Sequence, residues 1–221
     1  MTIFSIDIDG VLARKNVPQY IRACNEQLQL GIVEEDLVSL SHRQFLQHPQ
    51  VRAFTEHVGA DIAARKLGWV GYHPDVLLEN LTISGALEGV QKCYAQAKEL
   101  CYVTARFSPR ELQNAAMQVA TKSWLAAQGF PCADQITFCT CYEDKMRQLA
   151  HLCAYRNETV VHIDDSWKRL LLCTQQIPGS FLLAAFGAHK DEVIDCAHVL
   201  ALPAWKHIDM LFHQLQERMF A

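Results

Sequence analysis

The chain has 221 residues, of which 50% are hydrophobic and 20% are charged. This balance is typical of a globular protein with a sizeable core, and the length suits one α/β core that carries an insertion. Twenty lysines and arginines against 24 aspartates and glutamates give a formal net charge of -4. The basic surface that a duplex nucleic acid requires is therefore not expected, and duplex DNA is excluded as a partner.

The nine cysteines are scattered along the chain, mostly in apolar surroundings. Their odd number and irregular spacing favour reduced thiols in the cytoplasm over a disulfide framework. Cys139 and Cys141 are close in sequence, but no second pair or histidine stands at ligand spacing, so a zinc site is not expected. No charged segment precedes a long apolar stretch at the start, and no run approaches about 18 apolar residues. Neither secretion nor membrane association is expected.

Short apolar runs rich in β-branched and aromatic residues predict buried strands. The first run ends at Asp9-Gly10, a dipeptide typical of a turn. Amphipathic, helix-like segments precede the second run and lie between the later runs, at residues 86–99, 108–128 and 143–155. Alternating strands and helices predict a parallel, Rossmann-like sheet with right-handed crossovers. The predicted strands are residues 3–8, 100–103, 135–138, 159–163 and 181–185.

A long segment without a convincing strand separates the first two predicted strands. Helical patterns occur at residues 18–30, 34–46 and 51–67, followed by a glycine-flanked aromatic loop at residues 68–74. We therefore expect a core of residues 1–14 and 84–221 and an inserted, mostly helical cap of residues 15–83. In the loop, Trp69, Tyr72 and His73 are equally compatible with stacking on a base, closing a site or packing the cap.

Polar side chains follow three of the predicted strands. Asp7 and Asp9 end the first strand, Thr104 and Arg106 follow the second, and Asp164 and Asp165 follow the strand at residue 160. In parallel α/β sheets ligands bind outside the carboxyl ends of the strands, so we expect these side chains to gather at one edge. His162, inside a predicted strand, is expected to be a buried, hydrogen-bonded core residue rather than a ligand.

A cluster of carboxylates predicts a hard cation, because unpaired carboxylates packed together are costly. Magnesium keeps several waters and prefers one or two carboxylates together with a substrate phosphate. A phosphorylated ligand is therefore the expected companion. Asp7 could then attack phosphorus and form an aspartyl-phosphate, and Asp9 could serve as general acid and later as general base.

The same motifs carry a resemblance to a known family. A hydrophobic strand leads into Asp-x-Asp-Gly-Val, a second strand ends in Thr104, Lys145 opens a later helix, and another strand ends in Asp-Asp. This order resembles the haloacid dehalogenase-like (HAD) superfamily, and it is most similar to the magnesium-dependent phosphatases with a helical cap. The segment around residues 103–131 is also similar to the 5'(3')-deoxyribonucleotidase group.

The resemblance implies roles for individual residues. Asp7 would be the nucleophile and a metal ligand, and Asp9 would be the acid/base and offer its backbone carbonyl to the metal. Thr104 and Ala105 would bind the phosphoryl group. Lys145 would neutralise the phosphoryl oxygens and the nucleophile.

The metal site would be completed by the Asp-Asp pair. Asp165 would be the remaining ligand, because many relatives carry Gly-Asp at this position, and Asp164 would support it through water or Lys145. Position 169 is an arginine, so the acidic residue that some relatives carry there is absent. Arg106 is a candidate substrate contact, or else a structural salt-bridging arginine.

The sequence thus predicts a cytoplasmic, Mg²⁺-dependent phosphatase for a small phosphomonoester, with a nucleoside monophosphate as one candidate. A sugar phosphate or a polynucleotide phosphate end remains an alternative substrate. A non-catalytic binding or regulatory protein of the same fold is the alternative from another class. The presence together of all five motif residues argues against it: Asp7, Asp9, Thr104, Lys145 and Asp165. The expected partner is a small phosphorylated substrate, and the sequence does not indicate an oligomeric state.

Overall fold

A computed structural model of the chain describes residues 2–108, 110–156, 158–173, 180–193, 196 and 198–219. The chain divides into two compact units. The first, here called the core unit, comprises residues 1–14, 82–107 and 125–221. The second, here called the helical unit, comprises residues 15–81 and 108–124.

The core unit is built on a parallel sheet of six strands in the order β5-β4-β1-β6-β7-β8. This sheet confirms the predicted α/β class, and five of its strands coincide with the predicted runs. The sixth, β8, was not predicted, because VLAL has one β-branched residue and no aromatic residue, so this short apolar run does not distinguish a strand from part of a helix. The strands are β1 (Thr2–Ile6), β4 (Glu99–Thr104), β5 (Ile136–Phe138), β6 (Thr159–Asp164), β7 (Phe181–Phe186) and β8 (Val199–Leu202).

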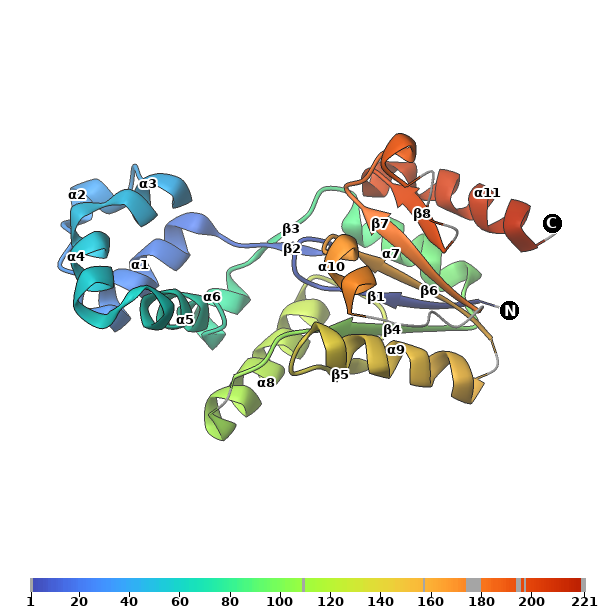
Figure 1. Cartoon of the computed structure of the whole chain (residues 1–221), viewed down its shortest axis with the longest axis horizontal. Helices are drawn as coiled ribbons and strands as arrows, with labels where there is room; N and C mark the ends of the chain where they lie inside the picture. The colour runs from blue at the N-terminus through green and yellow to red at the C-terminus, as the bar shows by residue number, and fades with distance from the viewer. Residues whose placement is uncertain are drawn as a thin grey trace. The chain divides into compact units, whose positions relative to one another are not determined.

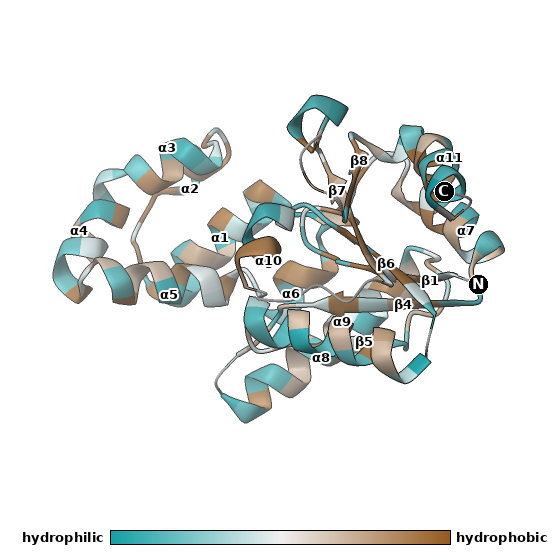
Figure 2. Cartoon of the chain, turned by 45° about the vertical axis from the view of Figure 1, so that its right-hand side comes forward, coloured by the Kyte–Doolittle hydropathy of each residue, from teal (hydrophilic) through white to brown (hydrophobic). Residues whose placement is uncertain are grey.

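Helices pack against both faces of this sheet, as Figure 1 shows. On one face, Ile3, Val160 and Leu183 share an apolar cluster with Met146 and Leu149 of α9 (Tyr142–Arg156), to which α10 (Trp167–Leu172) also contributes. The opposite face is covered by α7 (Ala86–Gln96) and α11 (Ile208–Met219). Because both faces are covered, the strands are nearly continuous apolar runs, and β6 and β7 are brown in Figure 2.

The helical unit contains α1 to α6 and has its own apolar core, which includes Tyr20, Phe45, Val51 and Leu67. Its helices are α1 (Val17–Leu28), α2 (Glu34–Leu37), α3 (His42–Gln47), α4 (Pro49–Val58), α5 (Ala60–Val70) and α6 (Pro74–Leu78). Most of α8 (Glu111–Ala127), up to Trp124, also belongs to this unit.

Two of the predicted helices in the insertion are each divided in the structure. Ser41 forms a capping box with Gln44 and starts α3, so the pattern at residues 34–46 becomes two helices. Gly59 has a φ of 88° and separates α4 from α5 within the pattern at residues 51–67. The aromatic loop predicted from residue 68 begins later, because α5 continues to Val70.

Two very short strands stand where the insertion begins and ends. β2 (Ala13–Arg14) pairs with β3 (Leu81–Thr82) in a separate two-stranded sheet. The expectation that residues 15–83 contain no strand was therefore wrong at β3, because two residues are too few for a periodic pattern. None of the nine cysteines forms a disulfide. No helix among the described residues has the length and apolar character needed to span a membrane.

Candidate active site

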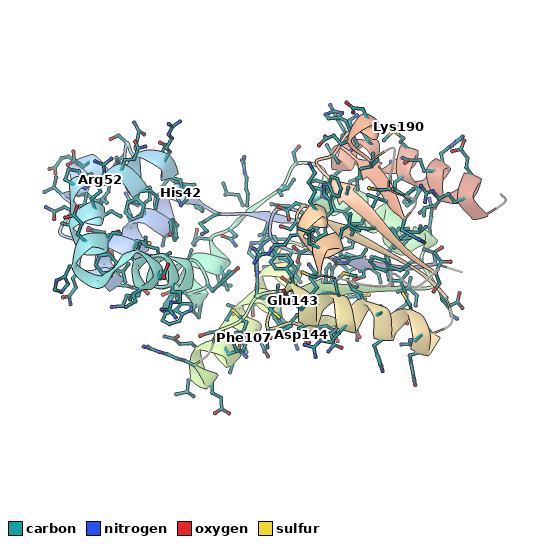
Figure 3. The ribbon with its side chains drawn as sticks, viewed as in Figure 1. His42, Arg52, Phe107, Glu143, Asp144 and Lys190 are labelled. Atoms are coloured by element: carbon teal, nitrogen blue, oxygen red, sulfur yellow. The ribbon has the colours of Figure 1, made fainter. Side chains whose placement is uncertain are left out.

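The candidate site lies at the carboxyl ends of the three central strands of the core unit. Asp7 follows β1, Thr104 is the last residue of β4, and Asp164 is the last residue of β6. Since β4 and β6 both pair with β1 in parallel, the strand ends are adjacent. Phe107, which follows β4, and Glu143 and Asp144, in the first turn of α9, are labelled at this end of the sheet in Figure 3.

Three of the predicted acidic residues come together here. Asp7, Asp164 and Asp165 each offer a carboxylate oxygen, and these oxygens lie within 4.8 Å of one another. Asp7 is 7% exposed and Asp164 is fully buried, whereas Asp165 is exposed. Oxygen ligands in such a group suit a hard divalent cation. Of the adjacent residues Asp164 and Asp165, only Asp165 is accessible to solvent.

Lys145 joins two of these carboxylates. Its Nζ atom lies 2.9 Å from Oδ1 of Asp7 and 2.5 Å from Oδ2 of Asp164, and its side chain is fully buried. Burial alone would lower the pKa of Lys145, but the charges of Asp7 and Asp164 raise that pKa above its usual range. Lys145 is thus a permanent positive charge, placed by the first turn of α9.

Asp164 is held by a network that includes three residues not predicted for the site. His162 Nε2 is 3.1 Å from Oδ2 of Asp164, and His162 Nδ1 is 3.0 Å from Oγ of Ser5. The backbone N–H of Ser166 donates to Oδ1 of Asp164 at 2.7 Å. Burial opposes the ionisation of Asp164, yet the His162 contact and the Lys145 charge hold the pKa of Asp164 below its ordinary value.

The buried position predicted for His162 is confirmed, since the residue is fully buried and hydrogen-bonded. Its contribution to the site could have been found from strand periodicity. Residues 162 and 164 are two apart on β6 and therefore point to the same face, and Ser5 is the register partner of His162 on β1. Polar side chains paired across two buried strands indicate a network rather than isolated core residues.

The pKa of Asp7 responds differently. Burial, opposed by the charge of Lys145 and assisted by the charges of Asp164 and Asp9, raises the pKa of Asp7 to about 7. A divalent cation beside Asp7 would favour the ionised carboxylate and relieve this repulsion. The donor set and the charge of the cluster therefore fit a bound magnesium ion.

Arg106 lies against Asp9. Its Nε and Nη2 atoms donate to the two carboxylate oxygens of Asp9 at 2.8 and 2.7 Å. The Arg106 side chain is 1% exposed, whereas that of Asp9 is 43% exposed. A bidentate pair of this kind is among the stronger hydrogen-bonded contacts, so Arg106 fixes the orientation of the Asp9 carboxylate.

Thr104, Ala105 and Gly10 complete this edge. Thr104 is 1% exposed, and its carbonyl accepts a hydrogen bond from the N–H of Cys139 at 2.8 Å, while Ala105 is half-buried. Gly10 has a φ of 75°, and a Cβ atom there would lie 2.0 Å from Oδ2 of Asp165. Only glycine fits this close approach, so the Asp-Gly turn leaves room for the Asp165 carboxylate.

The sequence matches no protein-family model and no curated protein. Its structure resembles that of a HAD-like hydrolase from Streptococcus pneumoniae, with a TM-score of 0.59, 14% identity and coverage of 96% and 98% of the two chains. A HAD-superfamily hydrolase of subfamily IA from Geobacter sulfurreducens gives a TM-score of 0.54, 12% identity and coverage of 96% of each chain. A phospho-aspartyl intermediate analogue of phosphoserine phosphatase gives 0.51, 11% identity and coverage of 95% and 97%.

These identities are low, so the likeness concerns the fold. The chain therefore has the α/β architecture of HAD-like hydrolases, with a cluster of buried and exposed aspartates at the carboxyl edge of its sheet.

Proposed function

We propose that this protein is a Mg²⁺-dependent phosphatase that hydrolyses a small phosphomonoester through an aspartyl-phosphate on Asp7. The observation that carries the proposal is the position of Lys145 between Asp7 and Asp164, with Asp165 beside them. Phosphoryl transfer requires a nucleophile and, beside it, positive charge that stabilises the negatively charged oxygens of the phosphoryl group. The HAD-like fold supports the proposal, because the same edge of the sheet is where such a fold binds ligands.

In the first step, an oxygen of Asp7 forms a bond to phosphorus as the bond from phosphorus to the leaving oxygen breaks. Asp9 gives a proton to that leaving oxygen, and Lys145 compensates the charge of the phosphoryl oxygens. In the second step, Asp9 takes a proton from water as the water oxygen attacks phosphorus. The bond between phosphorus and Asp7 then breaks, which releases inorganic phosphate and restores the Asp7 carboxylate.

The bound magnesium ion would neutralise phosphoryl charge in both steps. Asp7, Asp165 and the backbone carbonyl of Asp9 would hold it, and Asp164 would support this arrangement while it anchors Lys145. Thr104 and Ala105 would bind the phosphoryl oxygens. The substrate we propose first is a nucleoside monophosphate, as in the 5'(3')-deoxyribonucleotidase group, with a sugar phosphate as the second choice.

The partner would thus be a small phosphorylated molecule rather than duplex nucleic acid or a membrane. A cytoplasmic location suits nine unpaired thiols, because the cytosol keeps cysteines reduced.

The test is phosphate release from nucleoside monophosphates, sugar phosphates and a generic aryl phosphate, with magnesium and with EDTA. Asp7→Asn is assayed beside Asp61→Asn, which changes an exposed aspartate of α5. We expect release that requires magnesium, that is lost in Asp7→Asn and that persists in Asp61→Asn. Release that survives in Asp7→Asn, or no release from any member of the panel by folded protein with magnesium, would contradict the proposal.

A further inference from the structure

The helical unit contains a pocket formed entirely by its own residues. It encloses about 190 Å³ and lies between α5, the segment that leads into α6, and the start of α8. This pocket includes the aromatic segment of residues 69–74 that the catalytic proposal does not use. Its lining includes Lys66, Trp69, Tyr72, His73, Arg110 and Gln113.

The wall of this pocket combines flat rings with positive charge. Trp69, Tyr72 and His73 offer three rings, each half-buried, so part of each surface is accessible. The guanidinium carbon of Arg110 lies over a Trp69 ring, 5.8 Å from its centre, which places a cation beside the aromatic surface. Flat unsaturated rings stack on such side chains with an affinity that does not depend strongly on the identity of the ring.

The charged and hydrogen-bonding groups of the pocket further restrict the class of ligand that fits it. Lys66 and Arg110 are exposed cations, and no aspartate or glutamate is among the described residues that line the pocket. The Gln113 side chain offers both a donor and an acceptor, which matches the mixed polar edge of a nucleobase. A ligand that uses the rings, the cations and the amide is a flat heterocycle that carries negative charge.

We infer that this pocket binds a nucleotide, with the base on Trp69 and Tyr72 and the negative charge near Lys66 and Arg110. The inference goes beyond the proposed function, because the phosphate in this pocket would lie at Lys66 and Arg110 of the helical unit and not at Asp7 and Lys145 of the core unit.

The binding test uses nuclear magnetic resonance of the indole N–H signals in the Asp7→Asn variant with EDTA, so that no turnover occurs. The probes are a purine and a pyrimidine nucleoside monophosphate, the corresponding nucleosides, and ribose 5-phosphate. The Trp69 signal is assigned by its loss in Trp69→Phe. Trp124 and Trp205 are internal controls, since their indoles are buried and donate to the backbone carbonyls of Asn80 and Val11.

We expect both nucleotides to shift the Trp69 signal and leave the Trp124 and Trp205 signals in place. The nucleosides should bind on the order of tenfold more weakly, because they lack the charge that Lys66 and Arg110 attract. Ribose 5-phosphate should not shift the Trp69 signal. An equal response to ribose 5-phosphate, or no response to any nucleotide, would overturn the inference.

Variants separate the ring from the charge. Binding to these variants is measured by isothermal titration calorimetry, because the Trp69 variants lack the Trp69 signal. Trp69→Leu should weaken nucleotide binding on the order of tenfold, and Trp69→Phe should restore much of it because the ring is kept. Arg110→Gln should bring nucleotide binding down to the level of the nucleoside. The matched control is Arg52→Gln, which removes an exposed arginine of α4 outside the described lining and is labelled in Figure 3. Nucleotide binding unchanged in both Trp69→Leu and Arg110→Gln would overturn the inference.

The two proposals fail in different ways. Nucleotide binding at Trp69 without phosphate release from any substrate would overturn the phosphatase and leave the pocket standing. Magnesium-dependent release that is equal for ribose 5-phosphate and nucleotides, with no shift at Trp69, would leave the phosphatase standing and overturn the nucleotide pocket. Retention of the Trp124 and Trp205 signals in each variant shows that a loss of binding does not arise from unfolding.

Discussion

Arg106 donates to both carboxylate oxygens of Asp9, at 2.8 and 2.7 Å, from a side chain that is almost completely buried. This bidentate contact fixes the orientation of the Asp9 carboxyl group and favours its ionised form. That form is the one a general base requires, and it suits the second step of the proposed reaction. In the first step Asp9 carries the proton that it gives to the leaving oxygen, so one of the two contacts with Arg106 must then be released.

Substitution of Arg106 should therefore impair turnover more than substrate binding. We expect Arg106→Met to lower kcat on the order of a hundredfold and Arg106→Lys on the order of tenfold, because lysine keeps the charge but loses the bidentate geometry. KM should change little. Steady-state kinetics with the best substrate of the panel provide the measurement.

The control for Arg106 is Arg156→Met, which removes another arginine paired with a carboxylate. Arg156 lies 3.0 Å from Glu99, at a partly exposed position. It should leave kcat unchanged. If Arg106→Met instead raised KM and left kcat intact, Arg106 would bind substrate rather than position Asp9.

Removal of Lys145 should destabilise the fold as well as abolish activity. Lys145→Met leaves Asp7 and Asp164 close together and buried without their shared cation, and breaking a buried ion pair in this way costs about 3 kcal/mol. Urea unfolding at pH 7.5 without divalent cations measures the free energy of unfolding.

A surface lysine provides the matched control for Lys145. Lys98 pairs with Glu158 and is 49% exposed, so Lys98→Met should cost no more than about 1 kcal/mol. Equal losses for the two variants would contradict the view that Lys145 compensates a buried acidic cluster.

Much of the sheet could be predicted, because a parallel sheet covered on both faces has apolar strands that contrast with amphipathic helices. The runs at residues 100–103 and 159–163 match β4 and β6 to within one residue at each end. Subdivision of the insertion could not be predicted from apolar spacing alone. It depends on single backbone features, the positive φ of Gly59 and the capping box at Ser41, which leave the apolar pattern unbroken.

The candidate site was partly predictable for a related reason. Asp7 and Asp164 could be placed together because parallel strands end at one edge of the sheet. The pairing of Arg106 with Asp9 could not be derived, since Arg106 belongs to an irregular segment in which no periodicity indicates where a side chain points. The contribution of His162 was missed because a lone histidine on a buried strand is more often an ordinary core residue.

Gly10 should be required for cation binding as well as for the turn. Gly10→Ala imposes a φ of 75° on an L-residue and brings a Cβ atom to 2.0 Å from the Asp165 carboxylate, which must move. The expected result is a loss of about 1 kcal/mol in stability and a weaker magnesium-dependent rise in Tm. Differential scanning fluorimetry over a magnesium titration gives both quantities.

Gly187→Ala separates these two effects. Gly187 has a φ of 82°, and a Cβ atom there would meet nothing within 4 Å. This variant should lose similar stability and keep the magnesium response of the unmodified protein. A magnesium response that is equally weak in both variants would show that strain, rather than contact with Asp165, is responsible.

The stability of the core unit should fall at alkaline pH because of its buried thiols. Cys93 is fully buried on α7, and burial raises its pKa from 9.0 to about 12. Above pH 9 the unfolded chain loses the thiol proton while the folded chain keeps it, so stability present below pH 9 is lost as the pH rises toward 12. At pH 10 this group should account for a loss of about 1.4 kcal/mol.

Cys93→Ala isolates this contribution. The difference in unfolding free energy between the unmodified protein and Cys93→Ala, measured in urea with a reducing agent, should shrink by about 1.4 kcal/mol between pH 8 and pH 10. Val90→Ala truncates another fully buried side chain of α7 that has no titratable group, so its difference should stay constant. A constant difference for Cys93→Ala as well would mean that the thiol titrates alike in the folded and unfolded chains, contrary to its burial.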